Sequence, residues 1–318
     1  MIAPTFSDIL AARARIASRV HRTPVVTSRS FNALVGAEVF FKCENLQRAG
    51  AFKARGAMNA IFSLDDATAA RGIVAHSSGN HAAAVALAAR ERGVGARIAV
   101  PKNSSRAKIA AVERYGAQLV FTEPTIAARE AAAAHLLAIT GGTLVHPFND
   151  PLVMAGQGTA TLELLEDYPS LDLVIVPVSG GGLLSGTAIA AHGVNPKIRV
   201  VGAEPAAVDD AARSLASGQL ETNLTTNTIA DGLRASMSPA TFEIARRHVA
   251  QIVTVSEEEI VRAMRLCWEI LKIVIEPSSA VPVAALLENR VEAAAGRRIG
   301  VVLTGGNLDL DALPWSRA

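Results

Sequence analysis

One stretch of the sequence places a single lysine where its amine could do chemistry. Gly-Ala-Phe-Lys-Ala-Arg-Gly-Ala-Met-Asn at residues 50–59 sets Lys53 directly after Phe52, at a glycine-flanked helix start. A lysine attacks an aldehyde or removes a proton only after losing its own proton, and a partly desolvated niche favours that loss. An isolated Phe-Lys pair is more often found on a solvated helix face, because most lysines stay exposed. The catalytic hypothesis for Lys53 therefore depends on the rest of the chain.

Three further loops follow apolar runs and support that hypothesis. Each run has the length and composition of a strand in a buried parallel sheet. Ligands of open α/β sheets bind outside the carboxyl ends of such strands, so the three loops and Lys53 are expected to line one crevice. The loops are Ser-Ser-Gly-Asn-His at 77–81, Ser-Gly-Gly-Gly-Leu-Leu-Ser-Gly at 179–186 and Thr-Gly-Gly-Asn at 304–307.

In order and content these four motifs resemble fold-type II enzymes that use pyridoxal 5′-phosphate, specifically the serine/threonine dehydratase and serine racemase group, which includes hydroxyaspartate dehydratases. The resemblance runs from about residue 16 to residue 309. It implies an α/β fold of two lobes, with parallel twisted sheets flanked by helices, like the β subunit of tryptophan synthase. A large cofactor-binding lobe would comprise residues 1–65 and 150–318, and a small mobile lobe residues 66–149.

Strand-like and helix-like segments alternate from about residue 37 onward, which is typical of parallel sheets with crossover helices. The expected strands are residues 39–42, 72–76, 97–101, 118–122, 143–146, 173–178, 198–203, 252–255 and 300–303. Between them, stretches rich in Ala, Leu, Glu and Arg predict helices at 82–92, 105–115, 125–139, 154–166 and 257–271.

The glycine-rich loop resembles the family's phosphate-binding turn, which Gly180, Gly181, Gly182 and Leu183 would form here. Glycines let backbone N–H groups turn toward one anion, and a helix that begins near Leu183 adds its positive end. Taken alone, such a run is usually a tight strand-to-helix turn. A dinucleotide site would need an acidic residue about 20 residues further on, and Glu204, which is present there, matches another family feature.

Four residues would hold the cofactor ring, according to the same resemblance. Lys53 would form the Schiff base, and Phe52 would pack against the pyridine ring. Asn80 would contact the 3′-oxygen, and the Thr304 hydroxyl would meet the pyridine nitrogen. A neutral hydroxyl leaves that nitrogen largely unprotonated and weakens the electron sink, which disfavours transamination and suits β-elimination.

The loop at residues 77–81 precedes a helix, and a helix N-terminus is a ready site for an anion. The resemblance implies that Ser77, Ser78, Gly79 and His81 hold the α-carboxylate of the substrate. Ser78 also has a catalytic role by resemblance, because in the racemase and hydroxyaspartate-dehydratase branch a serine here faces the lysine across the cofactor plane. The same residue types make a simple N-cap turn, so both interpretations stay open.

Arg129 and two aromatic residues bear on the substrate. Arg129 matches an arginine that in racemase-like relatives can reach a substrate carboxylate, although a single helical arginine is more often a solvated surface residue. Turned inward, it would favour a second carboxylate, as in 3-hydroxyaspartate. Phe148 and Phe121 stand where some racemases have asparagine and tyrosine, and these departures disfavour efficient racemisation.

The segment Glu-Pro-Ala-Ala-Val-Asp-Asp at residues 204–210 resembles the divalent-metal loop of the racemase branch. Glu204 and Asp210 would supply carboxylate oxygens and Val208 its backbone carbonyl, with waters completing a shell suited to Mg²⁺ or Ca²⁺. Acidic residues this close together are also common in plain solvated loops.

The composition favours small-molecule ligands over nucleic acid or membranes. The 318 residues carry 31 basic and 29 acidic side chains, a formal net charge of +2, without a basic run. No apolar stretch approaches the length of about 18 residues that a membrane span needs, and no secretory signal is evident. These features predict a cytoplasmic protein, and the resemblance implies a homodimer.

Together these observations predict a pyridoxal-phosphate-dependent ammonia-lyase, or dehydratase, acting on a small amino acid. It would convert a β-hydroxy amino acid, either threonine or serine or else 3-hydroxyaspartate, to a 2-oxo acid and ammonia. An amino acid racemase of the serine or aspartate type is the alternative on the same scaffold. Outside this chemistry stand an NAD-dependent oxidoreductase and a non-catalytic protein that binds pyridoxal phosphate.

Overall fold

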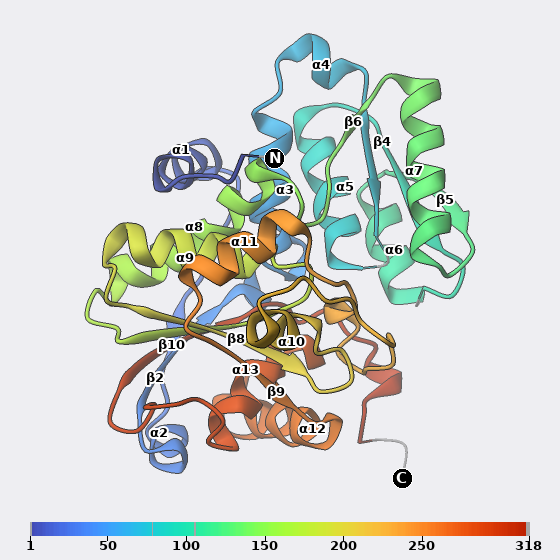
Figure 1. Cartoon of the computed structure of the whole chain (residues 1–318). Coiled ribbons are helices and arrows are strands. Elements are labelled where there is room, and N and C mark those ends of the chain that lie inside the picture. The colour runs from blue at the N-terminus through green and yellow to red at the C-terminus, as the bar shows by residue number, and fades with distance from the viewer. Residues whose placement is uncertain (1, 78, 105, 316–318) are drawn as a thin grey trace.

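The computed structural model describes residues 2–77, 79–104 and 106–315. Within these ranges the chain forms one sheet of six strands and one of four, each covered by helices on both faces (Figure 1). The predicted α/β class is confirmed. The four-stranded sheet is built from residues between Ile73 and Leu144, and the six-stranded sheet from segments on either side. The exact lobe boundaries at 65/66 and 149/150 stay a prediction.

The six-stranded sheet has the order β1-β2-β10-β7-β8-β9 and is parallel except for β1, which pairs antiparallel with β2. At its centre Val301 lies opposite both Phe41 and Ile175. The strands are β1 (Val25–Val26), β2 (Glu38–Cys43), β7 (Leu173–Pro177), β8 (Arg199–Pro205), β9 (Gln251–Val255) and β10 (Arg298–Leu303).

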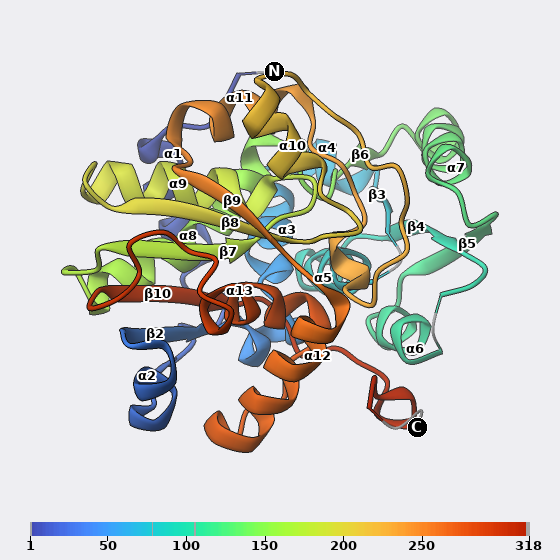
Figure 2. The same cartoon turned by 60° about the horizontal axis from the view of Figure 1, so that its bottom comes forward.

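Helices cover both faces of this sheet (Figure 1), and a view turned by 60° shows its strands β8, β7, β10 and β2 one beside the next (Figure 2). On one face lie α8 (Pro151–Asp167) and α9 (Gly182–Val194), which pack against each other and carry α1 (Phe6–Ile16) and α11 (Pro239–His248) outside them. On the other face lie α2 (Arg29–Val35), α12 (Glu257–Leu266) and α13 (Pro277–Leu287). The helix α10 (Asp210–Ser217) follows β8.

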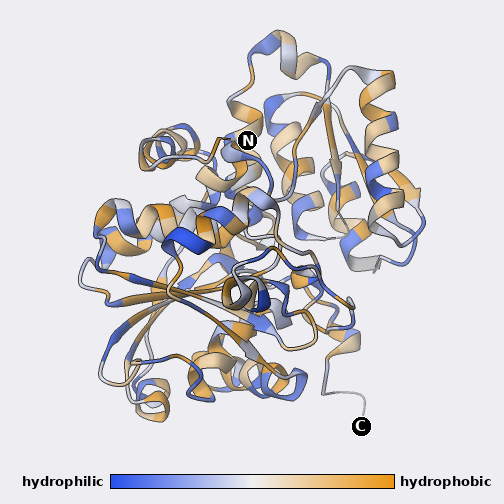
Figure 3. Cartoon of the chain, viewed as in Figure 1, coloured by the Kyte–Doolittle hydropathy of each residue, from blue (hydrophilic) through white to orange (hydrophobic). Residues whose placement is uncertain are grey.

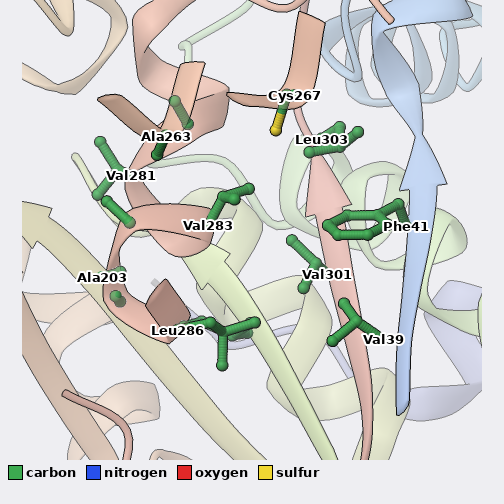
Figure 4. Close-up of a cluster of buried hydrophobic side chains, with 14 of the residues drawn as sticks. Val39, Phe41, Ala203, Ala263, Cys267, Val281, Val283, Leu286, Val301 and Leu303 are labelled. Carbon is green, nitrogen blue, oxygen red and sulfur yellow. The ribbon is translucent and has the colours of Figure 1, made fainter. Parts of the chain in front are cut away.

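The largest apolar cluster lies between the sheet and α12 and α13. Phe41, Val301 and Leu303 point from β2 and β10 toward Val283 and Cys267 (Figure 4). All five side chains are fully buried. Parallel strands buried on both faces consist almost entirely of apolar residues, and the strands at the centre of the molecule show this in Figure 3.

The four-stranded sheet has the order β5-β4-β3-β6 and is parallel throughout. Its strands are β3 (Ile73–His76), β4 (Ala96–Pro101), β5 (Gln118–Thr122) and β6 (Thr143–Leu144), and its helices are α4 (Asp66–Ala70), α5 (Asn80–Arg92), α6 (Arg106–Arg114) and α7 (Ile126–Thr140). The helix α3 (Lys53–Phe62) contacts both α8 and α5 and so joins the two parts of the molecule.

All nine expected strands are present, with ends shifted by a few residues. The two-residue strand β1 was not expected, because so short a segment leaves no periodic pattern. The helix expected at 257–271 is regular only to Leu266 and continues as a π-helical turn at Cys267–Leu271. Four short 3₁₀ turns complete the described elements, at Glu44–Leu46, Arg48–Gly50, Asp231–Leu233 and Leu310–Ala312. Among the described residues, none of the helices combines the length and apolar character that crossing a bilayer requires.

Candidate active site

Lys53 opens α3 and is tied to the loop after β10. The backbone N–H of Phe52 donates to the Thr304 carbonyl at 2.9 Å, and Ala51 forms a β-bridge with Gly305. The half-buried Lys53 amine donates to the Pro147 carbonyl at 2.7 Å. Burial lowers the pKa of Lys53 to about 8, because no counter-charge offsets the loss of water around the ammonium. The amine is therefore easily deprotonated, as a nucleophile or base must be.

A buried ion cluster fixes the helix that carries this lysine. Arg55, two residues further on, is fully buried and bonds to both Glu44 and Glu163. Lys42 on β2 completes the cluster with a 2.7 Å bond to Glu163. Sequence reasoning missed it, because its four residues come from three separate segments that only folding brings together.

The loop after β3 carries the residues expected to hold the α-carboxylate. Gly79 N–H donates to Ser77 Oγ at 3.2 Å, and α5 begins at Asn80, so the loop does lie at a helix N-terminus. His81 is buried, and its Nε2 lies 2.9 Å from the Val145 carbonyl. Burial, together with the nearby charge of Lys53, lowers the pKa of His81 well below its usual value, so the ring is neutral. Ser78 lies outside the described residues, and its role stays a prediction.

The side chain of Asn80 is held from the far side of the crevice. Its Nδ2 donates to Glu276 at 2.7 Å, and its Oδ1 accepts from Asn307 at 2.9 Å. Glu276 was not anticipated. The only local signal was an acidic residue before Pro277, which by itself indicates the start of a helix and no more.

The glycine loop forms the expected turn between β7 and α9. Gly181 has a φ of +86°, which favours glycine, and α9 begins at Gly182 without a side-chain cap for its first N–H groups. Thr241 donates to the Gly180 carbonyl at 2.9 Å. A Cβ atom at Gly180 would come within 2.3 Å of the Phe148 ring, so only glycine leaves room there for this aromatic residue. Leu183 is buried in the first turn.

Thr304 follows β10, and its hydroxyl is buried. The Oγ1 atom lies 3.0 Å from Ser279 Oγ, which also accepts from Gly305 N–H at 2.7 Å. Ser279 Oγ also donates to the Gly305 carbonyl at 2.7 Å and so holds the Thr304 hydroxyl in place at the end of β10. This serine lies on α13 and was also missed by sequence reasoning.

Arg129 lies on α7 and is half-buried, with burial lowering the pKa of its guanidinium. Burial is the main cause that lowers the pKa of His76 at the end of β3, and the positive charge of Arg129 contributes next. Arg129 therefore lies near the strand end that leads into the Ser77 loop. Phe121, by contrast, is 49 % exposed on β5.

The acidic segment that runs from the end of β8 to the start of α10 buries the carboxyl groups of Glu204 and Asp210 near each other. Glu204 accepts from the N–H groups of Ala211 and Ala212 at 3.3 and 2.9 Å. Burial and the neighbouring Asp210 raise the pKa of Glu204 well above its usual value. Burial also raises the pKa of Asp210 to about 6, and its Oδ1 is buried without a partner.

This loop offers a cation two carboxylates and little more from side chains. In the part of the chain that the structure describes, no three or more histidine, cysteine, aspartate or glutamate side chains gather at one point. Asp209 is engaged by Arg213 at 2.8 Å. Val208 is buried, and its predicted role as a backbone ligand stays a prediction. The unpartnered Asp210 oxygen is the observation that fits a cation best.

The comparison with protein families identifies the cofactor class. Residues 16–305 match the family model described as pyridoxal-phosphate dependent enzyme. This chain belongs to that family. The match includes Lys53, the loops at 77–81 and 179–186 and Thr304, and a pyridoxal-phosphate family favours the phosphate interpretation of the glycine loop over the dinucleotide one.

Members of the family resemble this chain over nearly its whole length. The beta-hydroxyaspartate dehydratase of Paracoccus denitrificans is 49% identical over 99% of this chain and 100% of that protein. A serine racemase of Oryza sativa subsp. indica is 49% identical over 96% of this chain and 91% of that protein. Among solved structures, maize serine racemase has 48% identity and a TM-score of 0.96, covering 99% of this chain and 97% of that one.

The crevice fits pyridoxal phosphate as a family member should. It offers an amine of lowered pKa, a glycine turn at a helix N-terminus and a buried hydroxyl with a fixed neighbour. Lys53 would hold the cofactor covalently, the glycine loop would receive the phosphate, and Thr304 would meet the ring nitrogen. Phe52 lies beside the lysine, with Nζ 5.0 Å from its ring centroid.

Proposed function

We propose that this enzyme is an ammonia-lyase that converts a β-hydroxy amino acid to a 2-oxo acid and ammonia. The carrying observation is the Lys53 amine, held by the Pro147 carbonyl with its pKa lowered to about 8. The overall reaction removes water across the α and β carbons, and hydrolysis of the resulting enamine replaces its nitrogen with oxygen. The similarity to a dehydratase over the full length of both chains supports this assignment.

When bound, pyridoxal phosphate supplies an aldehyde for the substrate amine and an electron-withdrawing ring that acidifies the α-proton. Lys53 takes that proton, because its lowered pKa lets the amine act as a base. Ser77, Gly79 and His81 orient the α-carboxylate at the start of α5. Lys53 can then return its proton to the departing β-hydroxyl, so that water leaves and the lysine is restored.

The substrate class that we infer is a β-hydroxy amino acid with a second carboxylate, such as 3-hydroxyaspartate. The support is the half-buried Arg129 near His76, at the strand end that leads to the carboxylate loop. A guanidinium binds a carboxylate through two parallel hydrogen bonds, which serine and threonine cannot use. Serine and threonine remain the substrates to compare with it.

Racemisation is the second candidate, favoured by the similarity to serine racemases. It requires a second acid or base opposite Lys53, and the proposed residue is Ser78. Elimination initiated by Lys53 does not require it. The Ser78→Ala variant should therefore lose racemisation and keep elimination from the lysine face, as chiral chromatography of the amino acid would show.

A divalent cation, Mg²⁺ or Ca²⁺, is part of the proposal, held by Glu204, Asp210 and the Val208 carbonyl. The support is a pair of adjacent buried carboxyl groups, one with an unpartnered oxygen. The site follows β8, outside the loops that surround Lys53, so its role would be to stabilise the fold. The homodimer and the cytoplasmic location stay predictions.

The test of the function is a 2-oxo acid release assay across L- and D-serine, L- and D-threonine and the four stereoisomers of 3-hydroxyaspartate. We expect at least one 3-hydroxyaspartate isomer to give the highest kcat/KM. Formation of D-amino acid without oxo acid would overturn the lyase assignment in favour of racemisation.

Substrate selection is tested by Arg129→Ala. The variant should lower kcat/KM for 3-hydroxyaspartate about thirtyfold, on the order of 2 kcal/mol, and change threonine little. Arg97→Ala, on β4 of the same sheet, serves as the control and should leave both values unchanged. An equal loss for both substrates would make Arg129 a structural residue.

A further inference from the structure

A buried carboxylate without a role in the reaction above lies behind Asn80. Glu276 precedes α13, is 2 % exposed and donates its backbone N–H to the Gly305 carbonyl at 3.0 Å. Its Oε1 accepts from Asn80 Nδ2 at 2.7 Å. A Cβ atom at Gly305 would lie 2.5 Å from this oxygen, so the glycine leaves the space that the carboxylate occupies.

Only one direction of hydrogen bonding satisfies this group of side chains. The Ala49 carbonyl can only accept, so the Asn307 atom 2.7 Å from it must be the amide nitrogen. That nitrogen also lies 2.9 Å from the Asn80 side chain, where it needs an oxygen to accept its second proton. Asn80 must therefore turn its Oδ1 toward Asn307 and its NH₂ group toward Glu276. The reverse amide orientation would oppose donors on one side and acceptors on the other.

The consequence concerns the second N–H of Asn80. An amide nitrogen carries two protons, and Glu276 accepts only one of them. The other is the donor that Asn80 can offer to the 3′-oxygen of the cofactor. We propose that Glu276 is a positioning residue, which keeps the Asn80 amide nitrogen facing the cofactor. This inference rests on the proposed role of Asn80 and extends the site to a residue that never touches substrate.

The same contacts connect the two sheets. Asn80 begins α5 beside the four-stranded sheet, whereas Glu276 and Asn307 follow elements of the six-stranded sheet. Lys108 of α6 also faces Glu276 and is itself ion-paired with Asp231. A glutamate keeps one accepting oxygen whether or not it is protonated, so positioning depends on the acceptor and not on the charge.

The experiment separates the hydrogen-bond acceptor of Glu276 from its charge. In the holoenzyme, Glu276→Met removes the acceptor, Asn307→Asp removes the donor that fixes the amide, and Glu276→Gln retains an acceptor of the same shape. We expect the first two variants to raise the dissociation constant of pyridoxal phosphate by about tenfold or more and to shift the visible absorbance of the lysine-bound cofactor. Glu276→Gln should keep the dissociation constant within about threefold of that of the unsubstituted protein and leave the absorbance band in place.

Two results would overturn the proposal. If Glu276→Gln loses as much affinity for pyridoxal phosphate as Glu276→Met, the negative charge of Glu276 supports cofactor binding and its hydrogen bond to Asn80 does not. If Glu276→Met binds and absorbs like the unchanged protein, Glu276 positions nothing. Glu288→Gln, at the other end of α13 and paired with Arg262, is the matched control and should change neither readout. Both readouts need no substrate, so failure of the lyase assignment leaves them interpretable.

Discussion

The fold pairs the buried charges beside α3 with opposite charges, whereas Lys53 and the two carboxyl groups of Glu204 and Asp210 form no ion pair among the described residues. In the cluster around Arg55, two cations and two carboxylates bond to one another, so each charge meets its opposite. In the crevice the Lys53 amine has a backbone carbonyl as its partner, and burial alone lowers its pKa. Glu204 and Asp210 are two like charges side by side.

The charges around Arg55 stabilise the fold, whereas Lys53, Glu204 and Asp210 are the charges that we expect to bind a ligand. A buried charge without a partner costs free energy, and the group responds by shifting its pKa toward the neutral form. Lys53, Glu204, Asp210 and Glu276 all shift in that direction. The cofactor's aldehyde would use the first, and a divalent cation the second and third.

The largest effect is expected when the uncompensated lysine is removed. Lys53→Ala should lower turnover by a factor on the order of a thousand or more, because the covalent link and the base disappear together. Measurement of 2-oxo acid release gives the rate, and loss of the visible absorbance band confirms the missing link. Turnover above about one part in twenty would contradict the assignment.

A sharper form of the comparison uses stability in place of activity. Arg55→Met leaves Glu44 and Glu163 without their shared partner and should lower the free energy of unfolding by about 3–5 kcal/mol. Lys53→Met removes a charge that has no counter-charge and should cost less than about 1 kcal/mol. Urea unfolding of both cofactor-free variants measures the difference. Equal losses would mean that the two regions are not distinct.

Glu276 should make stability depend on pH. Burial raises its pKa from 4.5 to about 7, so in this window the folded protein holds a proton that the unfolded chain has released. Stability then falls as the pH rises through the window, and Glu276→Gln removes this dependence. Relative to the unchanged protein, the free energy of unfolding of the variant should rise by about 2–3 kcal/mol between pH 5 and pH 8. A constant difference between the two proteins across this range would contradict the shift.

The smallest effect concerns the acidic loop. Mg²⁺ at ten times its dissociation constant should stabilise the protein by about 1.4 kcal/mol, because it binds the folded state alone. Thermal melting with Mg²⁺ and with a chelator measures the shift. Asp210→Ala should abolish it, whereas Asp209→Ala, at a residue already paired with Arg213, should retain it. If the unsubstituted protein gives identical melting curves with Mg²⁺ and with the chelator, the proposed cation site is contradicted.

The local pattern of apolar and glycine residues predicted the strands and helices that such a pattern can mark. Apolar runs ending in glycine-containing loops predicted β3 of the four-stranded sheet and β7 and β10 of the six-stranded sheet. The two-residue β1 and the π-helical turn after Leu266 have no such pattern and were missed. Lys53 lies next to the Thr304 loop, because the N–H of Phe52 bonds to the Thr304 carbonyl, and Asn80 is tied to the same loop through Asn307.

The residues that support the site could not be found in this way. Glu276 bonds to Asn80 across 196 positions of sequence, and Pro147 accepts from Lys53 across 94. Glu276 and Ser279 look in the sequence like an ordinary helix start after a loop. Only the packing of the two sheets against α3 brings these distant residues together as hydrogen-bond partners.

The sequence by itself determined the chemistry: a lysine, a glycine turn and a hydroxyl, in an order that indicates a pyridoxal-phosphate enzyme. The order of these motifs resembles the family closely enough to name its cofactor, and the family match confirms it. The tertiary structure decided which charges are compensated, which way the Asn80 amide faces and how far the pKa of Lys53 falls. These properties depend on burial and on partners distant in the chain, and burial exists only once the whole chain has folded.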